Sequence, residues 1–157
     1  MAEIPLHGKL AAGRVALVDD ADVALVSAYR WFFLPSGYAH ANPYLGNYRK
    51  GSVYMHRLIL QPPDGMDTDH RNRNRLDNRR GNLRVATRSQ NLANKTPQPG
   101  KYRGLKKERR AVTWQARIKV RGRTICLGNY RTPEEAAAAY NKAAKEHFGD
   151  FAVLNAV

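Results

Sequence analysis

The segment DTDHRNRNRLDNRRGNLRVATRSQN, residues 67–91, constrains the fold most, because it is too polar to form a core of its own. It holds seven arginines, five asparagines, three aspartates and one histidine. A segment that only carried positive charge would need neither an Asp-His pair nor so many side-chain amides. The pattern predicts two short strands, DTDH and NLRVA, joined by a polar loop. A helix RSQNLANK should follow, with Thr87 or Ser89 as its N-cap.

The residues before this segment predict a small α+β platform over residues 1–53. RVALVDD is typical of a strand, DADVALVSAY of a helix beginning at Asp20 or Asp22, and RWFFLPSGYAHAN of aromatic-rich strands around a turn. A second domain is expected over residues 54–95, opening with a helix in SVYMHRLIL. His56 lies in this helix, where a structural role is favoured over a catalytic one.

The residues after it predict a separate domain. TPQPGK, residues 96–101, has the composition of a linker. TWQARIKV alternates, with apolar residues on one face and Gln115, Arg117, Lys119 and Arg121 on the other. TICLGNY alternates again, with Ile125 and Leu127 expected inside. These strands predict a three-stranded antiparallel sheet within residues 102–157.

A helix should cover the apolar face of this sheet. Thr132-Pro133-Glu134-Glu135 forms a capping box with proline at the first helical position, and Gly149 should end the helix after Phe148. The alanines between them allow close packing on the sheet. The predicted fold class is therefore α+β throughout, with an open cationic face on the last sheet.

Charge is concentrated toward the end of the sequence and indicates a polyanionic partner. Of the net charge of +14, residues 1–66 carry +1, residues 67–95 carry +5 and residues 96–157 carry +8. Nucleic acid is the usual partner of such a field, and an anionic membrane surface is disfavoured because the basic residues do not line one long amphipathic helix. The sequence has no run of about 18 apolar residues and no secretory signal, so a cytoplasmic protein with no membrane partner is expected.

The polar segment also has the chemistry of a phosphodiesterase. The single cysteine, Cys126, excludes a multi-thiolate zinc site, so a bound metal must use oxygen or imidazole ligands. Mg²⁺ is often held by only one or two protein oxygens, which Asp69 and Asn91 could supply. A neutral His70 could accept a proton from water, and Asn82 could orient the histidine ring or pin the loop. The same loop could instead merely wrap phosphate.

The residues DHRNRNRLDNRRGNLRVATRSQN closely resemble the HNH endonuclease family in its homing-endonuclease-like branch, and YMHRLIL before them fits the same branch. The resemblance covers residues 54–95 and implies the ββα-metal fold. It implies that His70 is the general base, that Asn82 orients the site, and that Asp69 and Asn91 bind a divalent ion. Mg²⁺ is the expected ion, Mn²⁺ the alternative, and zinc is not expected. Genes of this build often occur in bacteriophages and mobile elements, and some family members nick DNA.

Residues 101–155 resemble the Apetala/ethylene-response-factor type of DNA-binding domain in YRG, W.A.I, LG.Y.T.EEAA.AY..AA and G..A.LN. That family reads DNA with its three-stranded sheet, and Arg103, Lys106, Arg117 and Lys119 fall where it contacts DNA. With the neighbouring basic residues, the expected DNA-binding set is Arg103, Lys106, Lys107, Arg109, Arg117, Lys119, Arg121 and Arg123.

The sequence thus predicts a metal-dependent DNA endonuclease that cuts double-stranded DNA with residues 54–95 and docks on it with residues 102–157. The alternative is a non-enzymatic DNA-binding regulator that retains an inactive HNH scaffold. An RNA-binding protein is disfavoured, because the open face of residues 115–121 lacks stacking aromatic side chains. Oligomeric state is left open.

Overall fold

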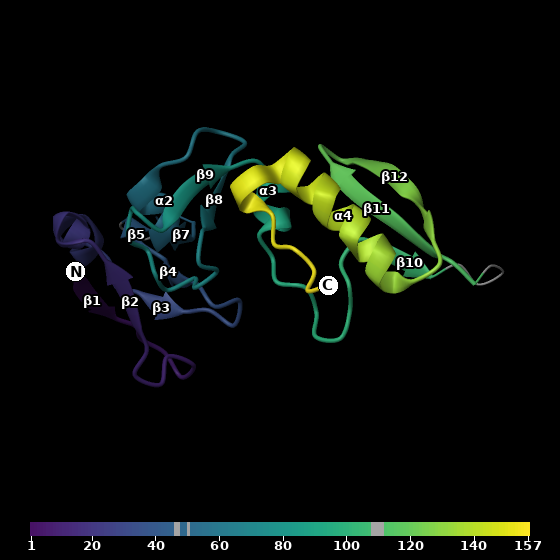
Figure 1. The fold of residues 1–157 in the computed structure, drawn as a ribbon. Coiled ribbons are helices and arrows are strands. Elements are labelled where there is room, and N and C mark those ends of the chain that lie inside the picture. Colours follow the sequence, from purple (N-terminus) through teal and green to yellow (C-terminus); the bar gives the residue numbers. More distant parts are fainter. Residues whose placement is uncertain (46–47, 50, 108–111) are drawn as a thin grey trace. The chain divides into compact units, whose positions relative to one another are not determined.

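The computed structural model describes residues 1–45, 48–49, 51–107 and 112–157 (Figure 1). Within them the protein is a mixed α+β structure, as the sequence predicts, and its helices and sheets are short except in the last third of the chain. The chain divides into two compact units, Met1–Val85 and Ala86–Val157. None of the helices in the described part of the chain combines the length and apolarity needed to span a bilayer.

The first unit is built from small sheets and two short α-helices. Its elements in chain order are β1 (Ala2–Pro5), β2 (Val15–Val18), the 3₁₀ turn η1 (Asp20–Asp22), α1 (Val23–Ser27), β3 (Phe32–Phe33), β4 (Ala39–Ala41), β5 (Tyr44–Leu45), β6 (Tyr48–Arg49), β7 (Val53–Tyr54), α2 (Met55–Leu60), β8 (Asp67–His70) and β9 (Leu83–Ala86). Strands β1 and β2 form an antiparallel pair, β3, β4 and β7 form one sheet, and β8 pairs with β9.

A single apolar cluster holds the first unit together. Trp31, Val18, Val26, Met55 and Ile59 are almost fully buried in it, so residues 1–53 share a core with α2. The indole of Trp31 donates a hydrogen bond to Val26 O at 2.8 Å, which satisfies its only polar atom. The N-terminal segment is therefore packed against the elements that carry the polar loop.

The helix expected from Asp20 or Asp22 is shorter than its pattern suggests. The chain makes a 3₁₀ turn over Asp20–Asp22, and α1 covers only Val23–Ser27. The Asp22 side chain makes no capping hydrogen bond because its carboxylate is buried in an ion pair with Arg80. The tertiary ion pair therefore uses the side chain that would otherwise have capped the helix.

The second unit contains the predicted sheet and helix. Its elements are α3 (Arg88–Ala93), β10 (Leu105–Lys107), β11 (Trp114–Val120), β12 (Arg123–Tyr130), α4 (Pro133–Phe148) and the 3₁₀ turn η2 (Gly149–Phe151). The strands form an antiparallel sheet in the order β10-β11-β12. Residues 96–101 contain neither helix nor strand.

Helix α4 packs its alanine-rich face on the sheet, mainly against β11. Thr132 and Glu135 form the predicted capping box, and Gly149 at φ 50° ends the helix. Tyr140 and Phe148 are buried together with four alanines of the helix, so the predicted apolar face is confirmed.

One expectation for this sheet is wrong. Ile125 was expected inside, but 40% of it is exposed. It lies opposite the buried Ile118 and shares its face, yet β12 is an edge strand and α4 packs mainly on β11. Alternation therefore identified the correct face, and the position of α4 decided how much of that face is covered.

Candidate functional site

Strands β8 and β9 carry the polar loop between them. Thr68, Asp69 and His70 at the end of β8 are all buried, although each is polar. Arg71 N donates to Asn82 O at 2.9 Å, and this hydrogen bond joins the two ends of the loop. Arg73 N donates to His70 O, also at 2.9 Å, and forms a tight turn directly after β8. The strand pair therefore presents the Asp-His pair at a tightly closed turn.

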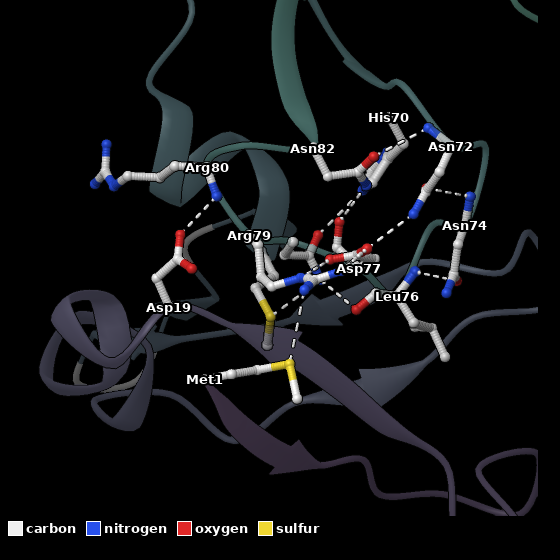
Figure 2. Close-up of polar contacts among 12 residues, drawn as sticks. Met1, Asp19, His70, Asn72, Asn74, Leu76, Asp77, Arg79, Arg80 and Asn82 are labelled. Carbon is white, nitrogen blue, oxygen red and sulfur yellow. Dashed lines mark hydrogen bonds and ion pairs between the residues drawn. The ribbon is translucent and has the colours of Figure 1, made fainter.

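Side-chain amides hold the loop in shape (Figure 2). Asn82 accepts a hydrogen bond from Asn72 N at 3.0 Å and donates one to Asp77 O at 2.7 Å. Asn72 Nδ2 donates to Asp77 Oδ2 at 2.8 Å, and Asn74 accepts from the Leu76 amide. Of the two roles considered for Asn82, these hydrogen bonds are those of a residue that pins the loop.

Asp77 is the ionised centre of this network. Arg79 donates two hydrogen bonds of 2.7 Å to its carboxylate, and these, with help from Asn72, hold the pKa of Asp77 below its usual value. A carboxylate that accepts several hydrogen bonds stays charged and keeps its donors in place. The loop is thus closed by an ion pair as well as by amides.

The N-terminal segment fastens the loop from outside. Leu17 N on β2 donates to Leu76 O, and Asn78 N donates to Leu17 O, each at 2.8 Å. Arg80 donates to the buried Asp22 carboxylate at 2.7 Å, and its own amide donates to Asp19 Oδ2 at 2.8 Å. Residues 1–53, for which the sequence suggested only a platform, therefore hold both sides of the polar loop.

The ring of His70 is held by an asparagine that sequence reasoning missed. Asn78 is fully buried and its Oδ1 lies 3.2 Å from His70 Nε2. Its Nδ2 donates to Leu76 O at 3.2 Å and contacts Met55 Sδ at 3.4 Å, so the carboxamide oxygen is the atom that faces the histidine. A carboxamide oxygen only accepts hydrogen bonds, so a neutral His70 donates from Nε2 and its Nδ1 carries no proton.

The surroundings of His70 favour its neutral form. Burial lowers its pKa below the ordinary histidine value, outweighing the hydrogen bond to Asn78 and the nearby Asp69, which act in the opposite direction. A neutral imidazole with an unprotonated nitrogen is the form that can take a proton from water.

A second histidine packs beside the first. His56 on α2 lies edge-on to His70 with ring centroids 5.2 Å apart, and Tyr38 and Tyr54 flank it at 4.9 and 5.6 Å. Burial and the neighbouring His70 lower the pKa of His56 to about 3, and its buried Nδ1 has no hydrogen-bond partner. This neutral ring packs against the side of His70, which agrees with the structural role favoured for it.

Asp69 makes a buried ion pair. Arg84 on β9 donates from Nε to Asp69 Oδ2 at 2.8 Å, and both side chains are less than a tenth exposed. In the described part of the chain, no cluster of three or more His, Cys, Asp or Glu side chains could hold a metal ion. A cation held by one carboxylate and one amide oxygen does not need such a cluster, so the donor chemistry of Asp69 and Asn91 fits a hard ion.

Asn91 lies on α3 in the second unit. Thr87, not Ser89, caps this helix, and it forms a capping box with Gln90. Ser89 instead accepts a hydrogen bond from Arg121 N at 3.0 Å. The sequence left the two caps open, and the capping box with Gln90 accounts for the choice of Thr87.

The predicted DNA-binding residues fall into three groups. Lys106, Lys107, Lys119, Arg121 and Arg123 are exposed on the sheet and its turn, and Arg117 is half-buried. Arg109 lies outside the described residues. Arg103 is turned toward α3, where its guanidinium bonds the carbonyls of Ala93 and Lys95.

Sequence reasoning missed Asn78 and Arg84 for the same reason. The segment contains five asparagines and seven arginines, and nothing in their spacing distinguishes the buried ones. Arg84 lies between Leu83 and Val85 on a predicted strand, so alternation places it on the opposite face from both, which does not indicate that it is buried. Asn78 gave no signal either.

The polar loop between β8 and β9 lies within the segment that matches a known protein family. A family model described as HNH endonuclease matches residues 53–93, from β7 to the end of α3. An uncharacterised HNH endonuclease of Acanthamoeba polyphaga mimivirus is 34% identical over 139 residues, which make up 85% of this chain and 70% of that protein. An ethylene-responsive transcription factor of Arabidopsis thaliana is 49% identical over 57 residues, which make up 35% of this chain and 13% of that protein.

Proposed function

The chain belongs to the HNH endonuclease family, and on that premise we propose that it is a divalent-metal-dependent DNA endonuclease with His70 as its general base. The observation that carries this proposal is the position of His70, whose buried ring is held by Asn78 through Nε2. Burial also lowers the pKa of the ring, which favours its neutral form. Nδ1 is then the atom that accepts a proton from the attacking water.

Asp69 and Asn91 are the proposed ligands of the divalent ion. A carboxylate and an amide oxygen suit Mg²⁺, with Mn²⁺ as the alternative, and zinc is not proposed because the one cysteine is exposed on β12. A divalent ion there would offset the charge that develops on the phosphate. Arg84 orients the Asp69 carboxylate through Oδ2, and Asn82 keeps the loop closed around His70.

The proposed substrate is double-stranded DNA, bound by the cationic side of the β10-β11-β12 sheet. Support comes from the exposed Lys119 and Arg121 of this sheet region and from the similarity to a transcription factor. The other proposed DNA-binding residues are Lys106, Lys107, Arg109, Arg117 and Arg123. Because one His70 is present per chain, we expect nicks before double-strand breaks.

A DNA-binding regulator without nuclease activity is the second candidate. The observation that favours it is the buried ion pair of Asp69 with Arg84, because a carboxylate bound by arginine is less available to a cation.

Conversion of supercoiled plasmid to relaxed circles separates the two candidates. We expect relaxation with Mg²⁺ or Mn²⁺, none with a chelator, and none with His70→Ala, which should still bind DNA. His7→Ala is the matched control, because His7 is an exposed histidine of the same unit, and it should cut like the parent. Absence of relaxation by the parent protein with either ion would favour the regulator.

A further inference from the structure

Arg103 occupies a position where the resemblance implies a DNA contact, yet its side chain points at the end of helix α3. Nη1 donates to Ala93 O at 2.5 Å, and Nη2 donates to Lys95 O. Ala93 is the last residue of α3, and its carbonyl has no partner within the helix, while Lys95 lies two residues beyond the helix end. A planar cation with two parallel donors is well suited to satisfy such carbonyls and to offset the negative end of the helix.

The backbone of Arg103 is fixed on both sides. Its N–H donates to Asn155 Oδ1 at 2.7 Å, and its carbonyl accepts from Asn155 Nδ2 at 3.2 Å. Asn155 is in turn bonded through its own backbone to the side chain of Asn141 on α4, at 2.7 and 2.9 Å. Next to Arg103, Gly104 packs directly against the ring of Tyr140. Arg103 therefore extends from a rigid part of the sheet domain.

Helix α3 has little apolar support within the second unit. It has six residues, and Ala93 is its only residue in the buried apolar cluster of this unit, while Leu92 is 41% exposed. A cleft of about 910 Å³ lies between α3 and β11. So short a helix is not stable on its own. Within this unit it is held near its ends, by Arg121 N to Ser89 Oγ at one end, and by Arg103 and the Val153 amide, which both donate to Ala93 O, at the other.

We propose that Arg103 is a positioning residue, which holds α3 and with it Asn91, and that it does not bind DNA. The consequence for cleavage rests on the proposed function, in which Asn91 is a metal ligand. Arg103 would then connect the sheet that docks on DNA to the helix that completes the cutting site.

The first test measures α3 itself and needs no activity. In hydrogen exchange of the full chain without DNA, Arg103→Gln should make the α3 amides exchange about tenfold faster, because the carbonyl contacts that anchor the helix are lost. The amides of Asn91 and Asn94, which donate to Thr87 O and Gln90 O, report on this directly. Amides of α4 should be unchanged. Arg103→Lys, which keeps one donor group, should give an intermediate rate.

The second test measures DNA affinity in the presence of a chelator. Arg103→Gln should bind DNA within about twofold of the parent, whereas the matched control Arg117→Gln should bind about tenfold more weakly. The control should leave α3 exchange unchanged. Unchanged α3 exchange in Arg103→Gln overturns the proposal, and so does a loss of affinity as large as that of Arg117→Gln.

The third test uses cleavage at saturating protein. Arg103→Gln should slow single-turnover cleavage at least about tenfold and require more Mg²⁺ for half-maximal rate, while Lys142→Ala, which changes an exposed lysine of α4 outside the proposed DNA-binding set, should cut at the parent rate. A parent-like rate and Mg²⁺ requirement in Arg103→Gln would overturn the role in cleavage. If the parent cuts no DNA, the proposed function fails, and the exchange and affinity measurements still decide whether Arg103 positions α3.

Discussion

The carboxamide of Asn78 donates to Leu76 O and so keeps its oxygen facing His70 Nε2. Removing that oxygen should release the ring. Asn78→Leu should populate both neutral tautomers of His70 and slow cleavage about tenfold or more, whereas Asn78→Asp keeps an oxygen acceptor and should keep the Nε2–H form. Long-range ¹H–¹⁵N NMR spectra of histidine-labelled protein at about pH 8, where imidazole is neutral, report the tautomer. A persistent Nε2–H form in Asn78→Leu would mean that another group orients the ring.

His56 should make the first unit sensitive to acid. Burial lowers its folded pKa to about 3, while the unfolded chain titrates near the ordinary 6.5. The unfolded state therefore takes up a proton below about pH 6.5 and the folded state does not. The free energy of unfolding thus decreases as the pH is lowered through this window. From about pH 7.5 to about pH 5, His56 should contribute a loss of about 2 kcal/mol.

Urea unfolding followed by Trp31 fluorescence, in a Trp114→Phe background, measures this loss in the first unit. Because Trp31 shares the buried cluster with α2, its signal reports on the unit that contains His56. His56→Phe should remove the 2 kcal/mol difference, as about that amount is assigned to the imidazole. Equal pH dependence in both proteins would show that His56 is not the titrating group.

At the residue scale, the sequence identified the polar positions but not their partners. Asp69 and His70 stand out as an acidic and an imidazole group in a basic segment, and both lie together at the end of β8. The pairing of Asp69 with Arg84 and of His70 with Asn78 could not be read from the sequence, because similar residues occur throughout the loop. Burial selects among them, and burial is a property of the fold.

At the element scale, Gly104 sets how closely β10 approaches α4. Its φ is +79°, and a Cβ there would lie 2.1 Å from Tyr140 Cδ2 and 2.6 Å from Arg117 O. Gly104→Ala should therefore destabilise the second unit by about 3 kcal/mol or more, since neither the backbone nor the buried ring can move away easily. Thermal unfolding followed by circular dichroism measures the change.

Gly122→Ala is the matched control for this prediction. Gly122 has a similar φ of +82°, but a Cβ there would meet nothing within 4 Å. It should cost only the backbone strain, about 1–2 kcal/mol. Equal destabilisation by the two variants would mean that backbone conformation, and not the contact with Tyr140, explains the glycine at position 104.

Elements with strong local signals were predicted well, and short ones less so. The capping box, proline and Gly149 define α4 at both ends, and β11 alternates as expected. The length of helix α1 was predicted less well because a distant arginine binds the carboxylate of Asp22. The exposure of Ile125 was predicted less well because it depends on where α4 packs on the sheet. Local chemistry is visible in sequence, whereas competition for a side chain by a distant partner is not.

At the scale of the whole molecule, the net charge of +14 should make DNA binding strongly salt-dependent. Each phosphate contact contributes about 0.9 to the slope of log affinity against log salt concentration. Arg117→Ala and Lys119→Ala should each reduce this slope by about 0.9 if they contact phosphate through the open side of the sheet. Fluorescence anisotropy of labelled DNA over a salt series measures it.

Lys142→Ala is the control for charge alone. Lys142 is exposed on α4, which covers the apolar face of the sheet, and its removal lowers the net charge by the same amount. It should leave the slope nearly unchanged, because it lies on the element that covers the other face. Equal effects of all three variants would indicate a diffuse field and no docking face.

The sequence by itself determined the fold class, the strand-loop-strand-helix order of the polar segment, and the residue types available for chemistry. These follow from periodicity, caps and composition, which act over a few neighbouring residues. Only the tertiary structure decided that residues 1–53 hold the polar loop, that Asn78 orients His70, and that Arg103 bonds the end of α3. Those contacts join residues distant in the chain or choose among identical neighbours, and burial and geometry make that choice.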